Sequence, residues 1–213
     1  MVRKIVERVP SEQLEKDLEK YRRQALELGV TDAKIIPSES VIIDERVRAK
    51  CMFPRCSRYG TNAHCPPHAM DVEQTKKLIK KYRFGIFTRL EVPPEFMAGA
   101  EAKEKKPYLP ANKKTYEIIS RIEAEAFYDG YYLAVAFGPG SCKGIFCEDV
   151  ECQALSAGMP CRVPLKARAS MEGMGMDVYA MATKAGWDIY PIGAATSPCE
   201  VPFGAAYGLV LIY

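Results

Sequence analysis

The chain has 213 residues, of which 48% are hydrophobic, and its 30 basic and 27 acidic residues leave a net charge of +3. So small a net charge gives no indication of a nucleic-acid partner. No apolar run approaches the roughly 20 residues of a membrane helix, and the charged residues 1–8 do not resemble a signal peptide, so we expect a soluble, cytoplasmic protein.

The first predicted elements are a helix and two short strands. Apolar side chains recur at three- and four-residue steps over residues 11–28, and Gly29 stands where a helix C-cap belongs. Short strands are expected at residues 33–36 and 41–43. Residues 51–70 have no period and are rich in Pro, Gly and Asn, which indicates a loop.

A second helix and a longer strand follow this loop. Asp71 and Gln74 have the spacing of a capping box, so we expect a helix from there through Tyr82. Residues 84–92 alternate like a strand. Residues 95–111 are polar and rich in Lys and Glu, which predicts a solvated connection.

The remaining elements repeat this pattern. Asn112 is a candidate cap for a helix whose apolar face holds Ile118, Ile119, Ile122 and Phe127. We then expect a strand at 131–137, an aperiodic loop at 142–165, and a methionine-rich helix at 170–185. The last strands are expected at 187–192 and 206–213.

These elements predict an α/β or α+β fold with a mixed β-sheet of about five or six strands and helices mainly on one face. Residues 1–213 are expected to form a single domain. Two halves, 1–94 and 112–213, joined by the polar segment 95–111, are the alternative. Each half has the order strand, cysteine loop, helix, strand, so an internal pseudo-repeat is a hypothesis, although direct identity between the halves is low.

The spacing Cys-x4-Cys-x8-Cys occurs twice, as Cys51, Cys56, Cys65 and as Cys147, Cys152, Cys161. Cys142 adds a fourth cysteine to the second set, where the first set has Arg46. The sequence therefore offers one four-thiolate site and one three-thiolate site, with Cys199 standing alone. In a reducing compartment such cysteines are metal ligands more often than disulfides.

The cysteine spacing favours iron–sulfur clusters over zinc. Structural zinc sites usually contain tight Cys-x2-Cys pairs, which this chain lacks in both cysteine sets. Cys65-Pro66 repeats the ending of the bacterial ferredoxin motif. We expect two [4Fe–4S] clusters, and zinc is the alternative cofactor.

The three-cysteine set leaves its fourth ligand open. Candidates are Cys199, His64 and His68, an outside molecule, or a cysteine exchanged between the two loops. A cluster iron without a protein ligand binds small molecules as a Lewis acid, so this site is the candidate for catalysis.

Several charged residues accompany the cysteines. The basic ones would offset cluster charge, hold an anionic substrate, dock an acidic partner, or simply be solvated. They are Arg55, Arg58, Lys143, Arg162, Lys166 and Arg168. Glu172 and Asp177 are candidates for acid–base chemistry, although helix capping explains them as well.

Two segments resemble a known family. Residues 50–60 followed by Cys65-Pro-Pro-His, and residues 140–142 followed by Cys161-Arg-Val-Pro and Ser170-Met-Glu-Gly-Met-Gly-Met-Asp-Val, are similar to predicted metal-binding proteins described as domain of unknown function 2284. The resemblance extends from about residue 10 to the C-terminus. It implies iron–sulfur or other metal binding, mostly in anaerobes, and no established reaction. Ala169 stands where the family favours proline.

The sequence is compatible with three functions. The first is low-potential electron transfer to a redox partner protein. The second is an enzyme that uses an open iron at Cys51, Cys56 and Cys65 for sulfur or reductive chemistry on a small-molecule substrate. The third is a zinc-stabilised structural or binding module. Clusters near a protein surface often lie at interfaces between subunits, so the chain is also compatible with a homodimer.

Overall fold

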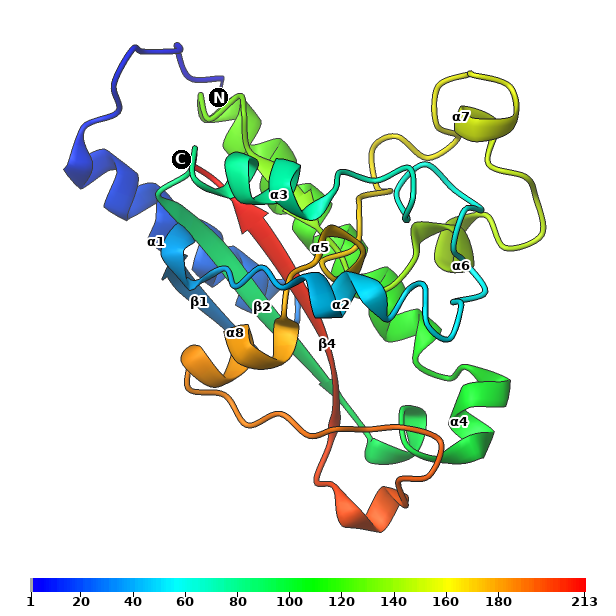
Figure 1. Ribbon diagram of the computed structural model, residues 1–213. Coiled ribbons are helices and arrows are strands. Elements are labelled where there is room, and N and C mark those ends of the chain that lie inside the picture. The colour runs from blue at the N-terminus through cyan, green and yellow to red at the C-terminus, as the bar shows by residue number, and fades with distance from the viewer. Residues whose placement is uncertain (1) are drawn as a thin grey trace.

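A four-stranded antiparallel sheet in the order β1-β2-β4-β3 forms the centre of the computed structural model, which describes residues 2–213 (Figure 1). The strands are β1 (Asp32–Pro37), β2 (Phe84–Val92), β3 (Val135–Phe137) and β4 (Gly204–Leu211). The longest pairing joins β2 to β4, from Gly85 with Leu211 to Val92 with Gly204. The fold is therefore α+β, and its middle strands come from distant parts of the chain.

The predicted mixed sheet of five or six strands is wrong. Ile43 forms only an isolated bridge with Met176, so residues 41–43 add no strand. Residues 187–192 also form no strand, because Trp187 instead packs its ring on Phe87 of β2, with the ring centroids 5.0 Å apart. The apolar residues of both segments cover the sheet rather than extend it.

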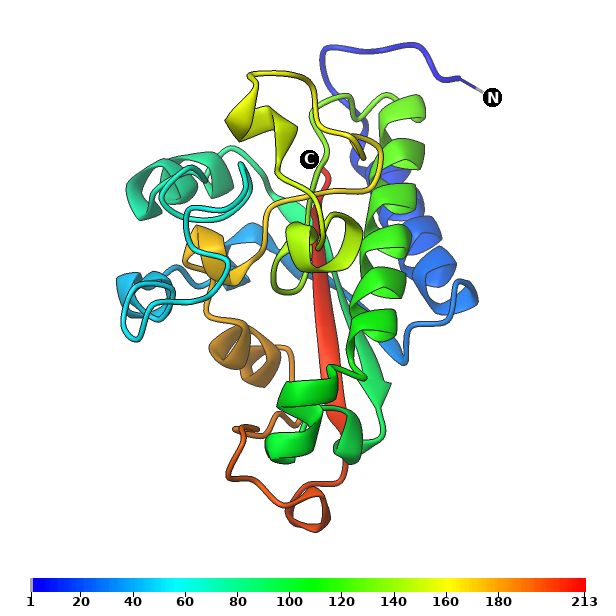
Figure 2. The ribbon, with the colours of Figure 1, turned by 90° about the vertical axis from the view of Figure 1, so that its right-hand side faces the viewer.

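Two long helices cover one face of the sheet (Figure 2). α1 (Ser11–Glu27) confirms the predicted helix, and Gly29 follows it with a φ of +93°, a conformation that favours glycine. α5 (Leu109–Tyr128) begins before Asn112 and has proline in its first turn. Phe127 is exposed rather than part of the buried face.

Short helices and loops cover the opposite face. They are α2 (Glu45–Ala49), α3 (Val72–Ile79), α8 (Val178–Lys184) and the 3-10 helices η1 (Ser38–Ser40) and η3 (Glu172–Met174). The predicted capping box of Asp71 and Gln74 begins α3. The predicted helix 170–185 is divided, because Gly175 takes a φ of +81° and Asp177 caps α8 by accepting from the Ala180 N–H.

Residues 95–111 are largely solvated, as predicted, but they form helices rather than a plain connection. They contain part of η2 (Pro94–Phe96), α4 (Gly99–Lys105) and the start of α5, and Ala98 and Ala102 are buried. η4 (Pro198–Glu200) lies at the lower end of the molecule in Figure 1. Among residues 2–213, no helix has both the length and the apolar composition that crossing a membrane requires.

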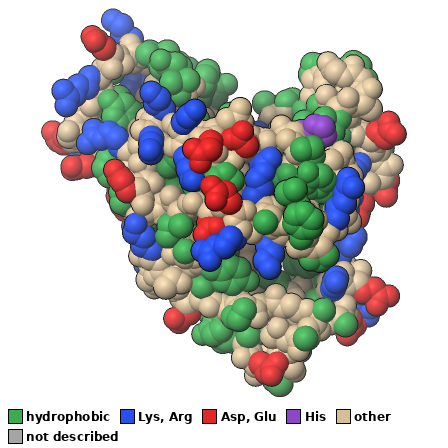
Figure 3. Space-filling view, viewed as in Figure 1, with side chains coloured by type: hydrophobic (Ala, Val, Ile, Leu, Met, Phe, Trp, Pro, Cys, Tyr) green, Lys and Arg blue, Asp and Glu red, His purple; other side chains and the backbone are tan. Residues whose placement is uncertain are grey.

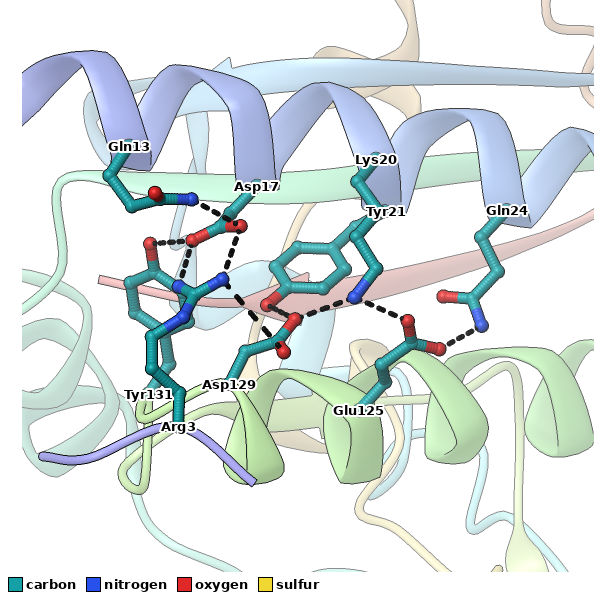
Figure 4. A network of polar contacts seen from close by, with 9 residues as sticks. All are labelled: Arg3, Gln13, Asp17, Lys20, Tyr21, Gln24, Glu125, Asp129 and Tyr131. Atoms are coloured by element: carbon teal, nitrogen blue, oxygen red, sulfur yellow. Dashed lines mark hydrogen bonds and ion pairs between the residues drawn. The ribbon is translucent and has the colours of Figure 1, made fainter. Parts of the chain in front are cut away.

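A polar network joins α1 to the C-terminal end of α5 (Figure 4). Asp17 accepts hydrogen bonds from Arg3 and from the Tyr131 hydroxyl, the latter at 2.7 Å. Asp129 accepts from Lys20 at 2.7 Å and from the Tyr21 hydroxyl at 2.8 Å. These contacts hold the two long helices in register over the sheet.

Candidate metal centre

The first cysteine loop leaves α2 and holds its cysteines at different depths. Cys51 is half-buried, Cys56 is exposed and Cys65 is buried. The Cys56 N–H donates to the Cys51 carbonyl oxygen at 3.0 Å, which closes a turn between them. Arg48 donates to the Gly173 carbonyl oxygen at 2.9 Å and thereby ties the start of the loop to η3.

The second cysteine loop places all four of its cysteines around one small, largely enclosed cavity. Cys142 opens α6 (Cys142–Phe146) and Cys147 follows that helix, while Cys152 precedes α7 (Gln153–Ser156). Cys161 comes from the segment after α7. The structure thus brings together the four members of the predicted four-thiolate set.

Direct contacts join the two loops. The Cys65 Sγ lies 3.3 Å from the Ser141 Oγ, and the Asn62 side-chain amide donates to the same hydroxyl at 3.2 Å. The Asn62 Oδ1 lies 3.8 Å from the Cys142 Sγ. Cys65 and Cys142 therefore share Asn62 and Ser141 as neighbours, so the two candidate sites are adjacent.

Asn62 was not identified from the sequence, and Ser141 was noted only as part of the segment 140–142, without a role for its hydroxyl. Asn62 is 1% exposed, which is unusual for an asparagine and marks it as a structural part of the site. The only signal in the sequence is that each lies within three residues of a cysteine. Polar residues are common in such loops, so this signal does not distinguish them from their neighbours.

The three side chains named as candidates for a fourth ligand, His64, His68 and Cys199, lie in different places. The His64 Nδ1 is 3.4 Å from the Cys142 Sγ, so this ring faces the second cysteine set. His68 is exposed near the end of the first loop. Cys199 is exposed in η4, 3.1 Å from the Ser197 hydroxyl, and Figure 1 places η4 at the end of the molecule away from both loops.

Burial and neighbouring thiols control the protonation of the cysteines. Burial, followed by the proximity of Cys65 and Cys161, raises the pKa of Cys142 to about 12. Burial also raises the pKa of Cys51, and that of Cys147 although Lys143 opposes it. These thiols are therefore neutral without metal, and a metal that binds them must displace their protons.

Burial lowers the pKa of His64, and the charge of Arg168 adds to this effect. The imidazole is therefore neutral at physiological pH. A neutral imidazole beside Cys142 can accept or donate one hydrogen bond, depending on which nitrogen carries the proton.

Three of the six basic residues near the cysteines form ion pairs. Arg58 of the first loop contacts Glu148 of the second at 2.7 Å, which adds a bridge between the loops. Lys166 contacts Glu117 of α5 at 2.8 Å, and Arg168 pairs with Glu123 on the same helix. The last two pairs anchor the segment that follows the second loop to α5.

No three Cys, His, Asp or Glu side chains of residues 2–213 converge closely enough to hold a single metal ion. Cys142, Cys147, Cys152 and Cys161 surround a cavity rather than a single point. Two backbone donors already face sulfur atoms: the Arg58 N–H lies 3.4 Å from the Cys56 Sγ, and the Val163 N–H lies 3.4 Å from the Cys161 Sγ.

A cleft of about 910 Å³ lies beside the first cysteine loop, and Cys51 and Cys56 contribute to its lining. The cleft reaches from α2 past η3 and α8 to β4. Its wall is mainly apolar, and hydrophobic side chains are exposed on the lower half of this face (Figure 3). Glu172 also lines the cleft, and burial raises the pKa of its carboxyl group.

Comparison with protein families gives one match. The model of the family described as "Predicted metal-binding protein (DUF2284)" matches residues 34–212. This range includes both cysteine loops and Cys199. No curated protein and no solved structure matches the chain.

Proposed function

We propose that the chain, which belongs to the DUF2284 family of predicted metal-binding proteins, holds two [4Fe–4S] clusters and transfers electrons to a partner enzyme. The observation that carries this proposal is the cavity lined by Cys142, Cys147, Cys152 and Cys161. Four cysteines are the complete ligand set of such a cluster. The second cluster is assigned to Cys51, Cys56 and Cys65.

The donor set fits a cluster better than a single ion. All seven assigned ligands are thiols, and thiolates select soft metals and iron–sulfur clusters. A cluster needs ligands spaced further apart than one zinc ion does, which agrees with cysteines grouped around a cavity without convergence on a point. When bound, the clusters would supply one-electron redox chemistry.

The protein residues around the cysteines would adjust this chemistry. The N–H groups of Arg58 and Val163 donate toward cysteine sulfur atoms, and such hydrogen bonds stabilise thiolate charge and raise the reduction potential. Asn62 and Ser141 hold the two cysteine sets next to each other, which favours electron exchange between them.

A redox partner would dock on the second loop. Cys147, Cys152 and Cys161 are half-buried, and the loop that carries them projects from the molecule at the upper right of Figure 1. The exposed Val150, Met159 and Leu165 give this loop an apolar surface that a partner can cover.

The second candidate function is an enzyme whose reaction takes place at the first cysteine set. The observation that favours it is that Cys51 and Cys56 line the large cleft. A small molecule bound there would reach the first cysteine set without passing through the protein core.

The first experiment is iron and acid-labile sulfide analysis of anaerobically purified protein and its cysteine variants. We expect about eight irons and eight sulfides per chain. Cys152→Ser removes one ligand of the four-cysteine set and should lower both values by about half. Cys199→Ser is the matched control, because Cys199 lies outside both loops, and it should leave them unchanged.

The outcomes separate the three functions. Zinc without sulfide would overturn the redox proposal and leave a zinc-stabilised module. Unchanged iron in Cys152→Ser would overturn the ligand assignment. With iron present, cyanide added to the reduced protein should perturb the EPR spectrum if the first site has an open iron, as the enzyme function requires.

A further inference from the structure

The cavity of the four-cysteine set is completed by the first cysteine loop. Its lining contains Asn62 and His64 of the first loop beside the four cysteines of the second. His64 lies 78 residues before Cys142 in the chain, so only the fold brings the two together. A cluster held in this cavity would therefore lie against polar side chains from both loops.

His64 contacts the sulfur of one of the assigned ligands. Its Nδ1 is 3.4 Å from the Cys142 Sγ, close enough for a ring N–H to donate a hydrogen bond to that sulfur. The imidazole is neutral, as argued above, and a neutral imidazole carries one N–H. The contact is therefore a single hydrogen bond whose direction depends on which partner holds the proton.

Cluster binding decides the direction of this hydrogen bond. A cysteine that ligates a cluster is a thiolate without a proton, so its sulfur accepts hydrogen bonds and does not donate them. The ring proton of His64 is then on Nδ1, the nitrogen that faces the sulfur. The Cys142 thiolate thereby gains a donor from the first loop.

Asn62 holds His64 and Cys142 in this arrangement. Its Oδ1 accepts a hydrogen bond from the His64 backbone N–H at 3.1 Å, and its Nδ2 donates to the Ser141 Oγ at 3.2 Å. Ser141 directly precedes Cys142 in the chain. Because Asn62 is itself buried, the fold sets the position of the imidazole against the sulfur.

Another cysteine of the same set has a donor of a different kind. The Val163 N–H lies 3.4 Å from the Cys161 Sγ, so this donor is a backbone group close to its cysteine in the chain. The donor that faces Cys142 is a side chain of the other loop. A side-chain donor can be removed by substitution, so its effect on the cluster can be measured.

We propose that His64 donates a hydrogen bond from Nδ1 to the Cys142 sulfur and so raises the reduction potential of the cluster on the second cysteine set. An N–H that donates to a ligand sulfur stabilises the more negative, reduced cluster. His64 is thus a positioning residue that acts through Cys142, and it is not the fourth ligand of the first set. The inference rests on the proposed function, since it requires a cluster at the second set.

The test is a redox titration of anaerobically purified protein followed by EPR, in which the second site is identified by the signal that Cys152→Ser abolishes. His64→Leu removes the donor. It should lower the ratio of reduced to oxidised cluster at a fixed potential by about fivefold, or roughly 40 mV for a one-electron couple. His64→Asn supplies an amide N–H in place of Nδ1 and should restore most of the wild-type potential.

Two controls distinguish a hydrogen-bond donor from a metal ligand. His68→Leu is the matched control, because His68 is exposed in the same loop, and it should shift neither potential. Iron and sulfide contents of the His64 variants should equal those of the wild type. Loss of iron in both variants would mean that His64 is a ligand and would overturn the inference. If only His64→Leu loses iron, a wild-type potential in His64→Asn supports the inference and a lowered one contradicts it.

The remaining outcomes separate this inference from the proposed function. An unshifted second-site potential in His64→Leu, or an equal shift in His64→Asn, overturns the role of His64 while iron and sulfide leave the two-cluster proposal intact. Protein without iron and sulfide overturns both, because there is then no cluster for His64 to influence.

Discussion

At the residue scale, one glycine, Gly138, controls how closely the second cysteine loop approaches the core. Gly138 directly follows β3, and its carbonyl oxygen accepts a hydrogen bond from the Met171 N–H at 3.0 Å. Tyr116 of α5 packs directly on it, since a Cβ at residue 138 would lie 2.4 Å from the Tyr116 ring. The glycine is therefore required by close packing at the point where the loop begins.

Gly138→Ala should destabilise the protein by about 1–3 kcal/mol, because Tyr116 is fully buried and its ring has no room to shift. It should also lower the iron content, since the ring would press against the start of the cysteine loop. Urea denaturation and iron analysis measure the two effects.

Gly193→Ala is the matched control, because a Cβ there meets no atom within 4 Å. It should change neither the unfolding free energy nor the iron content. An equally stable Gly138→Ala would contradict the packing argument.

At the scale of elements, α1 and α5 are joined by the carboxylates of Asp17 and Asp129. Burial by itself raises the pKa of Asp17, but hydrogen bonds from Arg3 and Tyr131 outweigh it, so the pKa in the folded protein is lowered. A lowered carboxyl pKa stabilises the fold above the unfolded value of about 3.9. This contribution is lost as the pH falls through the folded pKa.

Asp17→Asn should therefore cost about 1–2 kcal/mol at pH 7, as expected for a lost charged hydrogen-bond acceptor. The difference from the wild type should shrink as the pH falls below about 4, where the carboxyl of the unfolded chain takes up a proton, and should vanish below the lowered folded pKa, where the wild-type carboxyl is protonated in both states. Thermal unfolding across this pH range measures the effect.

Glu12→Gln is the control on the same helix, since Glu12 pairs with Lys16 at an exposed site. Exposed ion pairs contribute little to the free energy of unfolding, so the stability of Glu12→Gln should follow that of the wild type at every pH. A constant deficit in Asp17→Asn from pH 7 to pH 2 would contradict the electrostatic explanation.

At the scale of the whole molecule, the central strands are packed more fully by the rest of the protein than the cysteine loops are. β2 and β4 lie in the middle of the sheet with helices or loops on both faces. Residues 51–70 and 142–165 have little regular structure, and many of their side chains are exposed. Local unfolding should therefore begin in the loops.

Hydrogen–deuterium exchange should show the slowest exchange in β2 and β4. Protein that contains iron should protect residues 51–70 and 142–165 more than protein treated with a chelator, while β2 and β4 change little. The control segment is α1, which lies on the face of the sheet away from α2 and α8. Equal loop protection with and without iron would contradict metal binding by these loops.

Short sequence patterns predicted the elements that are capped by neighbouring residues or that bury side chains at a regular spacing. α1 and α3 follow from helical periodicity, together with the capping box of α3, because one face of each is buried. β2 follows from its alternation, although residues 85–88 are buried on both faces of the sheet. The division of residues 170–185 was missed because Met171, Met174 and Met181 keep a helical period across Gly175. Tertiary contacts, rather than periodicity, determine where those methionines are buried.

The sequence by itself determined the family, the two cysteine sets and most of the long elements, since these depend on residue identity and short-range spacing. Only the tertiary structure decided that the sheet has four antiparallel strands, that Asn62 and Ser141 join the two loops, and that His64 of the first loop faces Cys142 of the second. These features bring together residues far apart in the chain, such as β2 with β4. Such contacts arise from the packing of complete elements, which short-range spacing does not encode.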